Sequence, residues 1–231
     1  GSGGSAVQID GADRVLIAGN HLGMGGDGTT VGVNAVGVDI VGLGGVGTRV
    51  GGSAPADRNM ISGNDYAGVA LNGPNAIDTI IQGNEIGPTG AGVAGASFGV
   101  VAFDGASGAL IGGPGAGQGN RITGADTAVL FDSNPADSFG AVVSNRIWSN
   151  TGAGLDNLFD GHTANDPGDT DTGPNDLLNH PVITAATVSG GTVTLTYDLD
   201  VPAHAEQYRV EFFTNPSGAD AYGEGEQLAS S

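Results

Sequence analysis

The chain has 231 residues, 45 of them glycine, and it contains no cysteine. Its formal net charge is −19, so nucleic acid and anionic membrane surfaces would be repelled. The lack of cysteine excludes disulfide bonds and thiol chemistry. The glycines show no three-residue period and 39% of the residues are hydrophobic, which excludes a collagen helix and a disordered chain.

The first five residues, Gly-Ser-Gly-Gly-Ser, are interpreted as a tag or linker (residues 1–5). The sequence shows no signal peptide and no membrane-spanning segment. A repeat pattern begins abruptly at Ala6. We therefore expect the chain to be a segment of a longer protein, with neighbouring domains as partners.

Residues 6–160 carry an internal repeat of about 31 residues. Two series of apolar residues and one series of asparagines follow this repeat. The first series is Ile17, Val50, Ile81, Ile111 and Val142. The second series is Val7, Val38, Val69, Val100 and Val129. The asparagines are Asn20, Asn59, Asn84, Asn120 and Asn145.

A repeat of this size, built from short β-branched stretches bounded by Gly, Asn and Pro, is typical of a solenoid. We predict an all-β fold: a right-handed parallel β-helix in which each repeat forms one coil of three strands. Like strands would stack about 4.8 Å apart, in five to six coils. The asparagines are predicted to form a hydrogen-bonded ladder at a corner. Loops are predicted at 21–36, 52–58, 85–98 and 113–119.

Arg121 and Arg146 each follow a ladder asparagine directly, and Glu85 does so one coil before Arg121. Stacking of the coils would align these three residues. The sequence therefore predicts a column of ion pairs on the surface, of small energetic weight.

A second polar column follows the second apolar series at one corner and consists of Asp10, Asn72, Asp104 and Asp132. Asp104 and Asp132 would lie on consecutive coils, about 5 Å apart along the axis. Retaining glycosidases place their two carboxyl groups at about this separation. The same residues are also ordinary turn formers at the end of a strand, so both interpretations stay open.

The repeat degrades around residues 148–158, where the only tryptophan occurs. The end of a solenoid exposes unpaired strand edges and needs a cap. We predict that Trp148 and Phe159 cover this end.

Residues 161–180 form an acidic junction. Its centre, NDPGDTDTGPND, supplies five oxygen-bearing side chains: Asp166, Asp169, Asp171, Asn175 and Asp176. Calcium takes six to eight oxygen ligands, so this loop is predicted to bind Ca²⁺. It is not an EF-hand, because no glutamate stands at the twelfth position and no helix is expected beside it. The alternative is a solvated acidic turn.

Residues 181–231 change to a two-residue alternation, with Gly190-Gly191 and Pro202 between the alternating stretches. This pattern predicts antiparallel strands of an Ig-like segment. Only about three strands are expected, fewer than the seven of a complete sandwich. The segment is therefore predicted to be partial, and to pack on the end of the solenoid or pair with a second chain.

Five stretches carry a resemblance to a known class of proteins: LIGGPGAGQGNRITG, IIQGNEIGPTGAG, GVALNG, DTDTGPNDLLNHPVIT and YRVEFFTNPSGADAYGEGE. They resemble large bacterial secreted or surface proteins that are built of parallel β-helix repeats followed by an Ig-like segment. The resemblance implies a right-handed β-helix outside the cell, without assigned catalysis, that serves adhesion or surface architecture.

We therefore expect a non-enzymatic, extracellular structural or adhesive segment of a bacterial surface protein, stabilised by calcium. Its expected partners are a surface polysaccharide or another protein, and neither nucleic acid nor the interior of a membrane. The alternative is a carbohydrate-active enzyme, a hydrolase or lyase that uses Asp104 and Asp132. A glycan-binding module without turnover is a further alternative.

Overall fold

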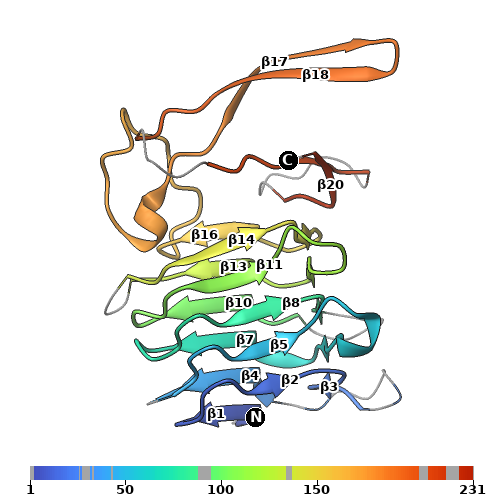
Figure 1. Ribbon diagram of the computed structural model, residues 1–231, viewed down its shortest axis with the longest axis vertical. Coiled ribbons are helices and arrows are strands. Elements are labelled where there is room, and N and C mark those ends of the chain that lie inside the picture. The colour runs from blue at the N-terminus through green and yellow to red at the C-terminus, as the bar shows by residue number, and fades with distance from the viewer. Residues whose placement is uncertain are drawn as a thin grey trace.

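The structure is a computed structural model of the whole chain (Figure 1). The residues that it describes are 3–25, 27, 32, 34–42, 44–87, 95–133, 137–202, 208–216 and 224–230. Parts of the predicted loops 21–36 and 85–98 fall outside these residues. Among the described residues, no helix has the length and apolar character needed to span a membrane.

Three parallel sheets run along the length of the solenoid (Figure 1). Each of the first five coils contributes one short strand to every sheet, and β16 adds a sixth strand to the first sheet alone. The first sheet contains β1 (Ser5–Asp10), β4 (Asn34–Val41), β7 (Asn64–Asn72), β10 (Phe98–Phe103), β13 (Thr127–Phe131) and β16 (Leu155–Asn157). The second contains β2 (Leu16–Ile17), β5 (Arg49–Gly51), β8 (Ile80–Gln82), β11 (Ala109–Gly112) and β14 (Gly140–Val143). The third contains β3 (His21–Leu22), β6 (Met60–Ile61), β9 (Glu85–Ile86), β12 (Arg121–Ile122) and β15 (Arg146–Ile147). The predicted parallel β-helix is confirmed.

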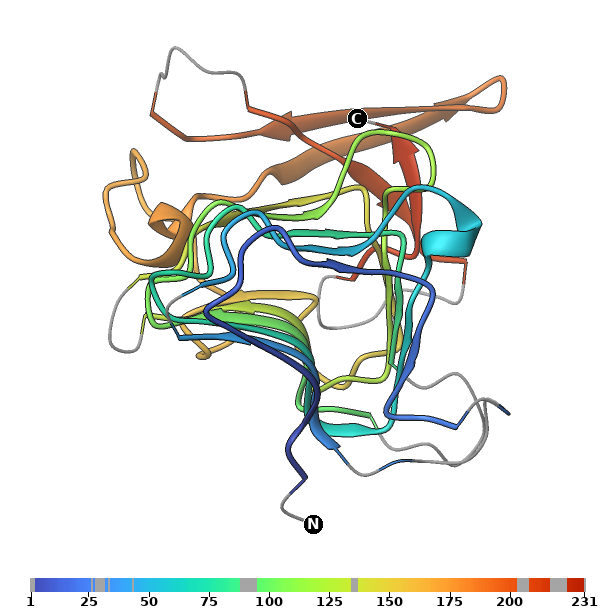
Figure 2. The ribbon, with the colours of Figure 1, turned by 60° about the horizontal axis from the view of Figure 1, so that its bottom comes forward.

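The strand register matches both apolar series of the sequence. In the second sheet, Ile81 pairs with Val50 on one side and with Ile111 on the other. In the first sheet, Val69 pairs in the same way with Val38 and Val100. Residues spaced by one repeat therefore lie directly above one another, and Figure 2 shows the successive coils following nearly the same outline.

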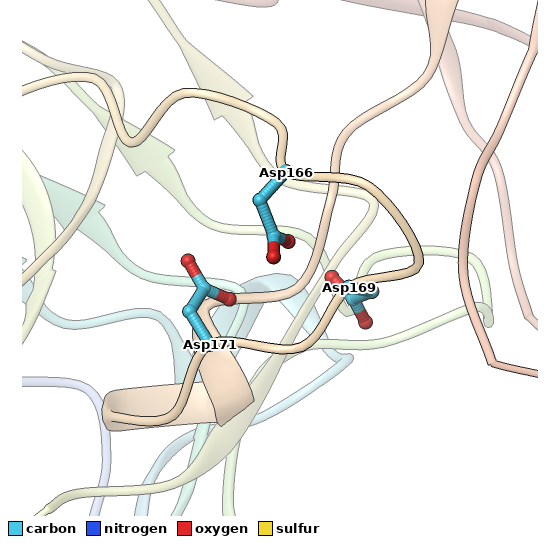
Figure 3. Close-up of side chains that lie close together, drawn as sticks. All are labelled: Asp166, Asp169 and Asp171. Carbon is cyan, nitrogen blue, oxygen red and sulfur yellow. The ribbon is translucent and has the colours of Figure 1, made fainter.

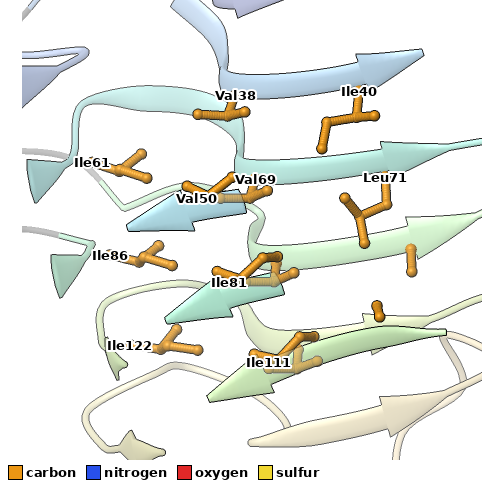
Figure 4. Packing of buried hydrophobic residues seen from close by; sticks show 14 of the residues in the cluster. Val38, Ile40, Val50, Ile61, Val69, Leu71, Ile81, Ile86, Ile111 and Ile122 are labelled. Atoms are coloured by element: carbon orange, nitrogen blue, oxygen red, sulfur yellow. The ribbon is translucent and has the colours of Figure 1, made fainter. Parts of the chain in front are cut away.

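The interior is filled by aliphatic columns (Figure 4). A third column, from the third sheet, contains Ile61, Ile86 and Ile122, each of which is 2% exposed or less. Opposite these isoleucines the first sheet carries glycines. A Cβ atom on Gly68 would collide with the Cγ2 atom of Ile86. The small residues of one sheet therefore make room for the large residues of another, which gives a dense core with few aromatic rings.

The five asparagines form the predicted ladder. The side-chain Nδ2 of each donates to the Oδ1 of the next at 2.9 to 3.1 Å, from Asn20 through Asn59, Asn84 and Asn120 to Asn145. The backbone N–H of each also donates to that same oxygen, at 2.9 to 3.3 Å. The second Nδ2 hydrogen of the last four reaches backbone carbonyls at 2.7 to 2.9 Å, those of Ile17, Val50, Ile81 and Ile111. Buried amides are thereby satisfied at a corner where the strands end.

A short 3-10 helix, η1 (Pro55–Asp57), lies in the predicted loop 52–58. A second 3-10 helix, η2 (Pro174–Leu177), lies in the acidic junction. Beyond it, β17 (Val182–Ser189) and β18 (Thr192–Asp198) form an antiparallel hairpin through Gly190 and Gly191. This hairpin projects beyond the stacked coils (Figure 1).

The C-terminal segment forms antiparallel strands, as predicted, but not the face of a sandwich. All residues of β17 are exposed, whereas a sandwich strand buries one face. A second antiparallel pair, β19 (Phe212–Thr214) and β20 (Gln227–Ser230), lies next to the last coil. The backbone N–H of Ile147 donates to the carbonyl of Gly225 at 2.9 Å, so the tail covers the end of the third sheet.

Of the two residues predicted to cover the solenoid end, only Trp148 lies there, half-buried beneath the guanidinium of Arg146, which is 5.2 Å from the ring centroid. Phe159 is 61% exposed and contacts Phe98 of β10 instead. The prediction for Phe159 was wrong, because the tail residues provide the cap.

Candidate functional site

The acidic junction brings together three of the five predicted cation ligands. One carboxylate oxygen from each of Asp166, Asp169 and Asp171 lies within 4.8 Å of the others (Figure 3). Asp169 has a φ of 53°, in the left-handed region, and Gly168 before it has a φ of 74°. The tight turn folds the loop back so that the three carboxylates converge.

Hydrogen bonds from Asn179 hold this loop in place. Its Oδ1 accepts from the backbone N–H of Asp166 at 2.9 Å, and its Nδ2 donates to the backbone carbonyls of Asp166 and Asp200. Its own backbone N–H donates to a carboxylate oxygen of Asp169 at 2.6 Å. Asn179 is 5% exposed, so these bonds are shielded from water. The loop is braced before any ligand binds.

The three carboxylates differ in their pKa values. Hydrogen bonds from the side chain and backbone of Thr170 lower the pKa of Asp166. Desolvation raises the pKa of Asp171, and the charges of Asp166 and Asp169 add to this rise. The Oδ1 atom of Asp171 is inaccessible to solvent and has no hydrogen-bond donor among the described residues. Such an oxygen suits a hard cation that prefers oxygen ligands.

Asn175 and Asp176 lie outside this cluster of carboxylates. The Oδ1 of Asn175 accepts from the backbone N–H of Gly140 at 2.8 Å, and its Nδ2 donates to Asn157. Asn175 thus ties η2 to the solenoid. Asp176 is exposed on η2. Asn175 and Asp176 were predicted as cation ligands because they are near the three aspartates in sequence. The turn of the chain after Gly173, which separates them from the cluster, was not predictable from the sequence.

Asp104 and Asp132, the two carboxylates considered for a glycosidase, are not level with each other in the strand register. Ala102 pairs with Phe131, so the residue level with Asp132 is Phe103, and Asp104 lies one position further along. Asp104 has a φ of 57° and belongs to the turn after β10. The register therefore gives no support to a catalytic pair of carboxylates at this corner.

The predicted ion-pair column is present. Glu85 lies between two arginines, at 3.7 Å from Arg121 and 3.8 Å from Arg58, and Arg121 pairs in register with Glu85 and Arg146. The arginine side chains are 42% exposed. Solvent screening limits each pair to about 0–1 kcal/mol, so this column contributes to surface charge rather than to a site.

A groove of about 560 Å³ lies over the outer face of the first sheet and was not predicted from the sequence. Its aromatic lining comprises Tyr66 from β7, Phe98 and Phe103 from β10, and Phe159 from the segment after β16. The rings of Tyr66 and Phe98 meet edge to face at 5.3 Å, and those of Phe98 and Phe159 at 5.4 Å. Three coils of the solenoid therefore contribute to one row of rings.

Two carboxylates, Asp126 and Asp132, stand at the groove. The hydroxyl of Thr151 donates to Asp126 at 2.9 Å, and the backbone N–H of Ser133 donates to Asp132 at 2.7 Å. Burial raises the pKa of the Tyr66 phenol, and the charges of Asp132 and Asp39 raise it further. The two carboxylates therefore give the groove a negative electrostatic potential.

The backbone that holds Phe159 is strained. Leu158 and Phe159 have φ values of 93° and 59°, a region that residues with a Cβ rarely occupy. Such conformations cost on the order of 1–3 kcal/mol each and persist where the surroundings impose them. Here this backbone conformation holds the largely exposed ring of Phe159 at the groove.

In comparisons with protein-family models, with curated proteins and with solved structures, this chain gave no match.

Proposed function

We propose that this chain is a structural or adhesive segment of a bacterial surface protein, that it lies outside the cell, and that it is not an enzyme. The observation that carries the proposal is the asparagine ladder, which runs from Asn20 to Asn145 without a break. Four coil-to-coil steps are joined by side-chain hydrogen bonds in addition to those of the three sheets. A stack joined in this way is stiff along its axis.

The charge and composition of the surface agree with this role. The net charge of −19 keeps such segments soluble and apart at high local concentration. The core relies on aliphatic columns and buried amides and needs no disulfide bond, because the chain has no cysteine. A rigid scaffold with exposed loops can present those loops to a surface polysaccharide or to another protein.

Calcium is proposed to brace the junction between the solenoid and the C-terminal hairpin. Asp166, Asp169 and Asp171 would supply carboxylate oxygens, and the shielded Oδ1 of Asp171 would gain a partner. Neutralising three nearby carboxylates would also remove their mutual repulsion. The bound ion would fix the path of the chain where it leaves the stacked coils.

The calcium site is tested by measuring the thermal midpoint in excess EDTA and in millimolar calcium at constant ionic strength. Calcium at about 100 times its dissociation constant stabilises by about 2.7 kcal/mol, which raises the midpoint by about 5–10 °C. The double substitution Asp169→Asn with Asp171→Asn should abolish the rise. Asp176→Asn, outside the cluster, should retain it. An equal midpoint in both solutions would show that the loop is a solvated acidic turn.

The absence of catalysis is tested on a panel of acidic and neutral polysaccharides. The proposal expects no release of reducing ends or of unsaturated products. Turnover of any of these polysaccharides would contradict it. Loss of that turnover in Asp132→Asn, with retention in Asp104→Asn, would assign the activity to the groove.

A further inference from the structure

The groove over the first sheet combines exposed aromatic rings with fixed negative charge. Tyr66 is 41% exposed and Phe159 is 61% exposed, although each ring touches the buried ring of Phe98. Asp126 and Asp132 stand beside these rings, and no arginine or histidine is among the described residues that line the groove. Within the described lining of the groove, no basic side chain neutralises these two carboxylates.

The floor of the groove is already formed. Val101 and Leu130 pair in adjacent strands and are 1% and 2% exposed, and Phe98 beside them is 6% exposed. They belong to an apolar cluster that is separate from the core inside the coils. The exposed rings of Tyr66 and Phe159 therefore stand over a rigid sheet, and a ligand that contacts them would not need to open the core. The volume of about 560 Å³ lies in the range of small-molecule sites.

The carboxylates are held in place by donors outside the ligand space. Thr151 donates to Asp126 and the backbone N–H of Ser133 donates to Asp132, so neither carboxylate has to be ordered when a ligand arrives. Burial raises the pKa of the Tyr66 phenol, and the negative charges of Asp132 and then Asp39 add to this rise. Aromatic faces and carboxylates both attract an organic cation, the first through the ring quadrupole and the second through charge.

We propose that the groove formed by Tyr66, Phe98, Phe159, Asp126 and Asp132 binds a substituted ammonium group. The rings contact the alkyl carbons of the cation, and the two carboxylates balance its charge. The group can belong to a free quaternary amine or to the side chain of a lysine on a partner protein. This inference is independent of the proposed structural role, because it rests on the outer face of the first sheet and not on the ladder.

The test uses choline and its neutral isostere 3,3-dimethylbutan-1-ol as probes in NMR titrations that follow the ring signals of Tyr66 and Phe159. The two molecules have the same shape and differ in charge. Choline is expected to bind about tenfold more tightly than the alcohol. Nα-acetyl-lysine amide and a neutral disaccharide are titrated in the same way to distinguish a lysine source and a sugar ligand.

Substitutions separate charge from fold. Asp132→Asn should weaken choline binding at least threefold and leave the alcohol unchanged. Asp104→Asn, one position outside the register of Asp132, removes the same charge nearby and should leave both unchanged. Phe159→Ala removes a mostly exposed ring, so the variant should fold, as checked by its circular dichroism, and lose choline binding. Equal binding of choline and the alcohol, no binding of choline, or tighter binding of the disaccharide would overturn the proposal.

Discussion

Glu224 accepts two hydrogen bonds from Asn150, in the same way that each ladder asparagine accepts two from the asparagine before it. One carboxylate oxygen of Glu224 accepts both the backbone N–H of Asn150, at 2.9 Å, and its side-chain Nδ2. Asn145 accepts from Asn120 in the same two ways. Asn150 in turn accepts from the backbone N–H of Ala125 on the preceding coil. A short second series of side-chain hydrogen bonds therefore runs from the backbone of Ala125 through Asn150 to the carboxylate of Glu224.

A side chain that accepts hydrogen bonds but has no donor group of its own suits the last coil of the stack. An asparagine at the position of Glu224 would present an Nδ2 group that needs a further coil, whereas an ionised carboxylate only accepts. Glu211 acts similarly at Ser144, whose N–H and hydroxyl both donate to it at 2.8 and 2.7 Å. The two glutamates from the tail thus terminate the solenoid and cover its edge.

Truncating Glu224 tests the cap. Glu224→Ala leaves the N–H and Nδ2 of Asn150 without their acceptor at a buried position, which should lower the free energy of unfolding by about 2–3 kcal/mol. Glu224→Gln retains an acceptor oxygen and should cost less than half as much. Urea unfolding of the three proteins measures the difference. Equal stability of the wild type and the alanine variant would show that the tail does not cap the stack.

The ladder should be strongest in its middle. Asn84→Ala removes donors to Asn120 and Val50 and the acceptor for two groups of Asn59, so we expect a loss of about 3 kcal/mol. Asn20 is exposed at the first coil, and Asn20→Ala should cost about 1 kcal/mol or less. Thermal and urea unfolding of both variants checks the ranking. A cost for Asn20→Ala equal to that for Asn84→Ala would mean that the ladder adds nothing beyond the turns.

Gly51 tests how closely the coils approach. Its φ is 82°, and a Cβ there would collide with the carbonyl oxygen of Gln82 on the next coil. Gly11 has a similar φ of 76° but open space around it. Both alanine substitutions carry a backbone cost of about 1–2 kcal/mol, and only Gly51→Ala adds about 1–3 kcal/mol of overpacking. Differential scanning calorimetry should therefore rank Gly51→Ala well below Gly11→Ala, and the reverse order would contradict the packing.

The cap should loosen in acid. Desolvation alone would raise the pKa of Glu211, but the hydrogen bonds from Ser144 and the contact with Arg209 outweigh it and lower the pKa below its ordinary value of 4.5. Since the folded-state pKa is the lower one, this stabilisation is present above pH 4.5 and is lost as the pH falls through the folded-state value. Glu211→Gln should show a shallower loss of stability between neutral and acid pH. Parallel pH profiles for both proteins would contradict the assignment.

The repeated part of the fold was predictable because the same sequence pattern recurs in each coil. Val50, Ile81 and Ile111 occupy equivalent places, so the period alone aligned them, and the ladder asparagines followed from the same alignment. The hand of the helix remains a prediction, from the general preference for right-handed parallel connections.

Positions where one coil differs from the next by a residue were not predictable in this way. Asp104 and Asp132 sit at similar distances from their strands, yet a slip of one residue moves Asp104 into the turn. Glu224 meets Asn150 across 74 residues of sequence, with no local pattern to announce it. The groove had a weak signal: Val101 alternates with the inward Val100, so its side chain had to be covered on the outer face.

Pulling single molecules apart by atomic force microscopy, with handles at the two termini, tests the structural role most directly. If the ladder stiffens the stack against tension, the wild-type solenoid should rupture at a higher force than the Asn84→Ala variant at the same loading rate. Asn20→Ala, at the first coil, should rupture close to the wild-type force. Equal rupture forces for the wild type and Asn84→Ala would contradict the proposal that the ladder makes this chain a structural segment.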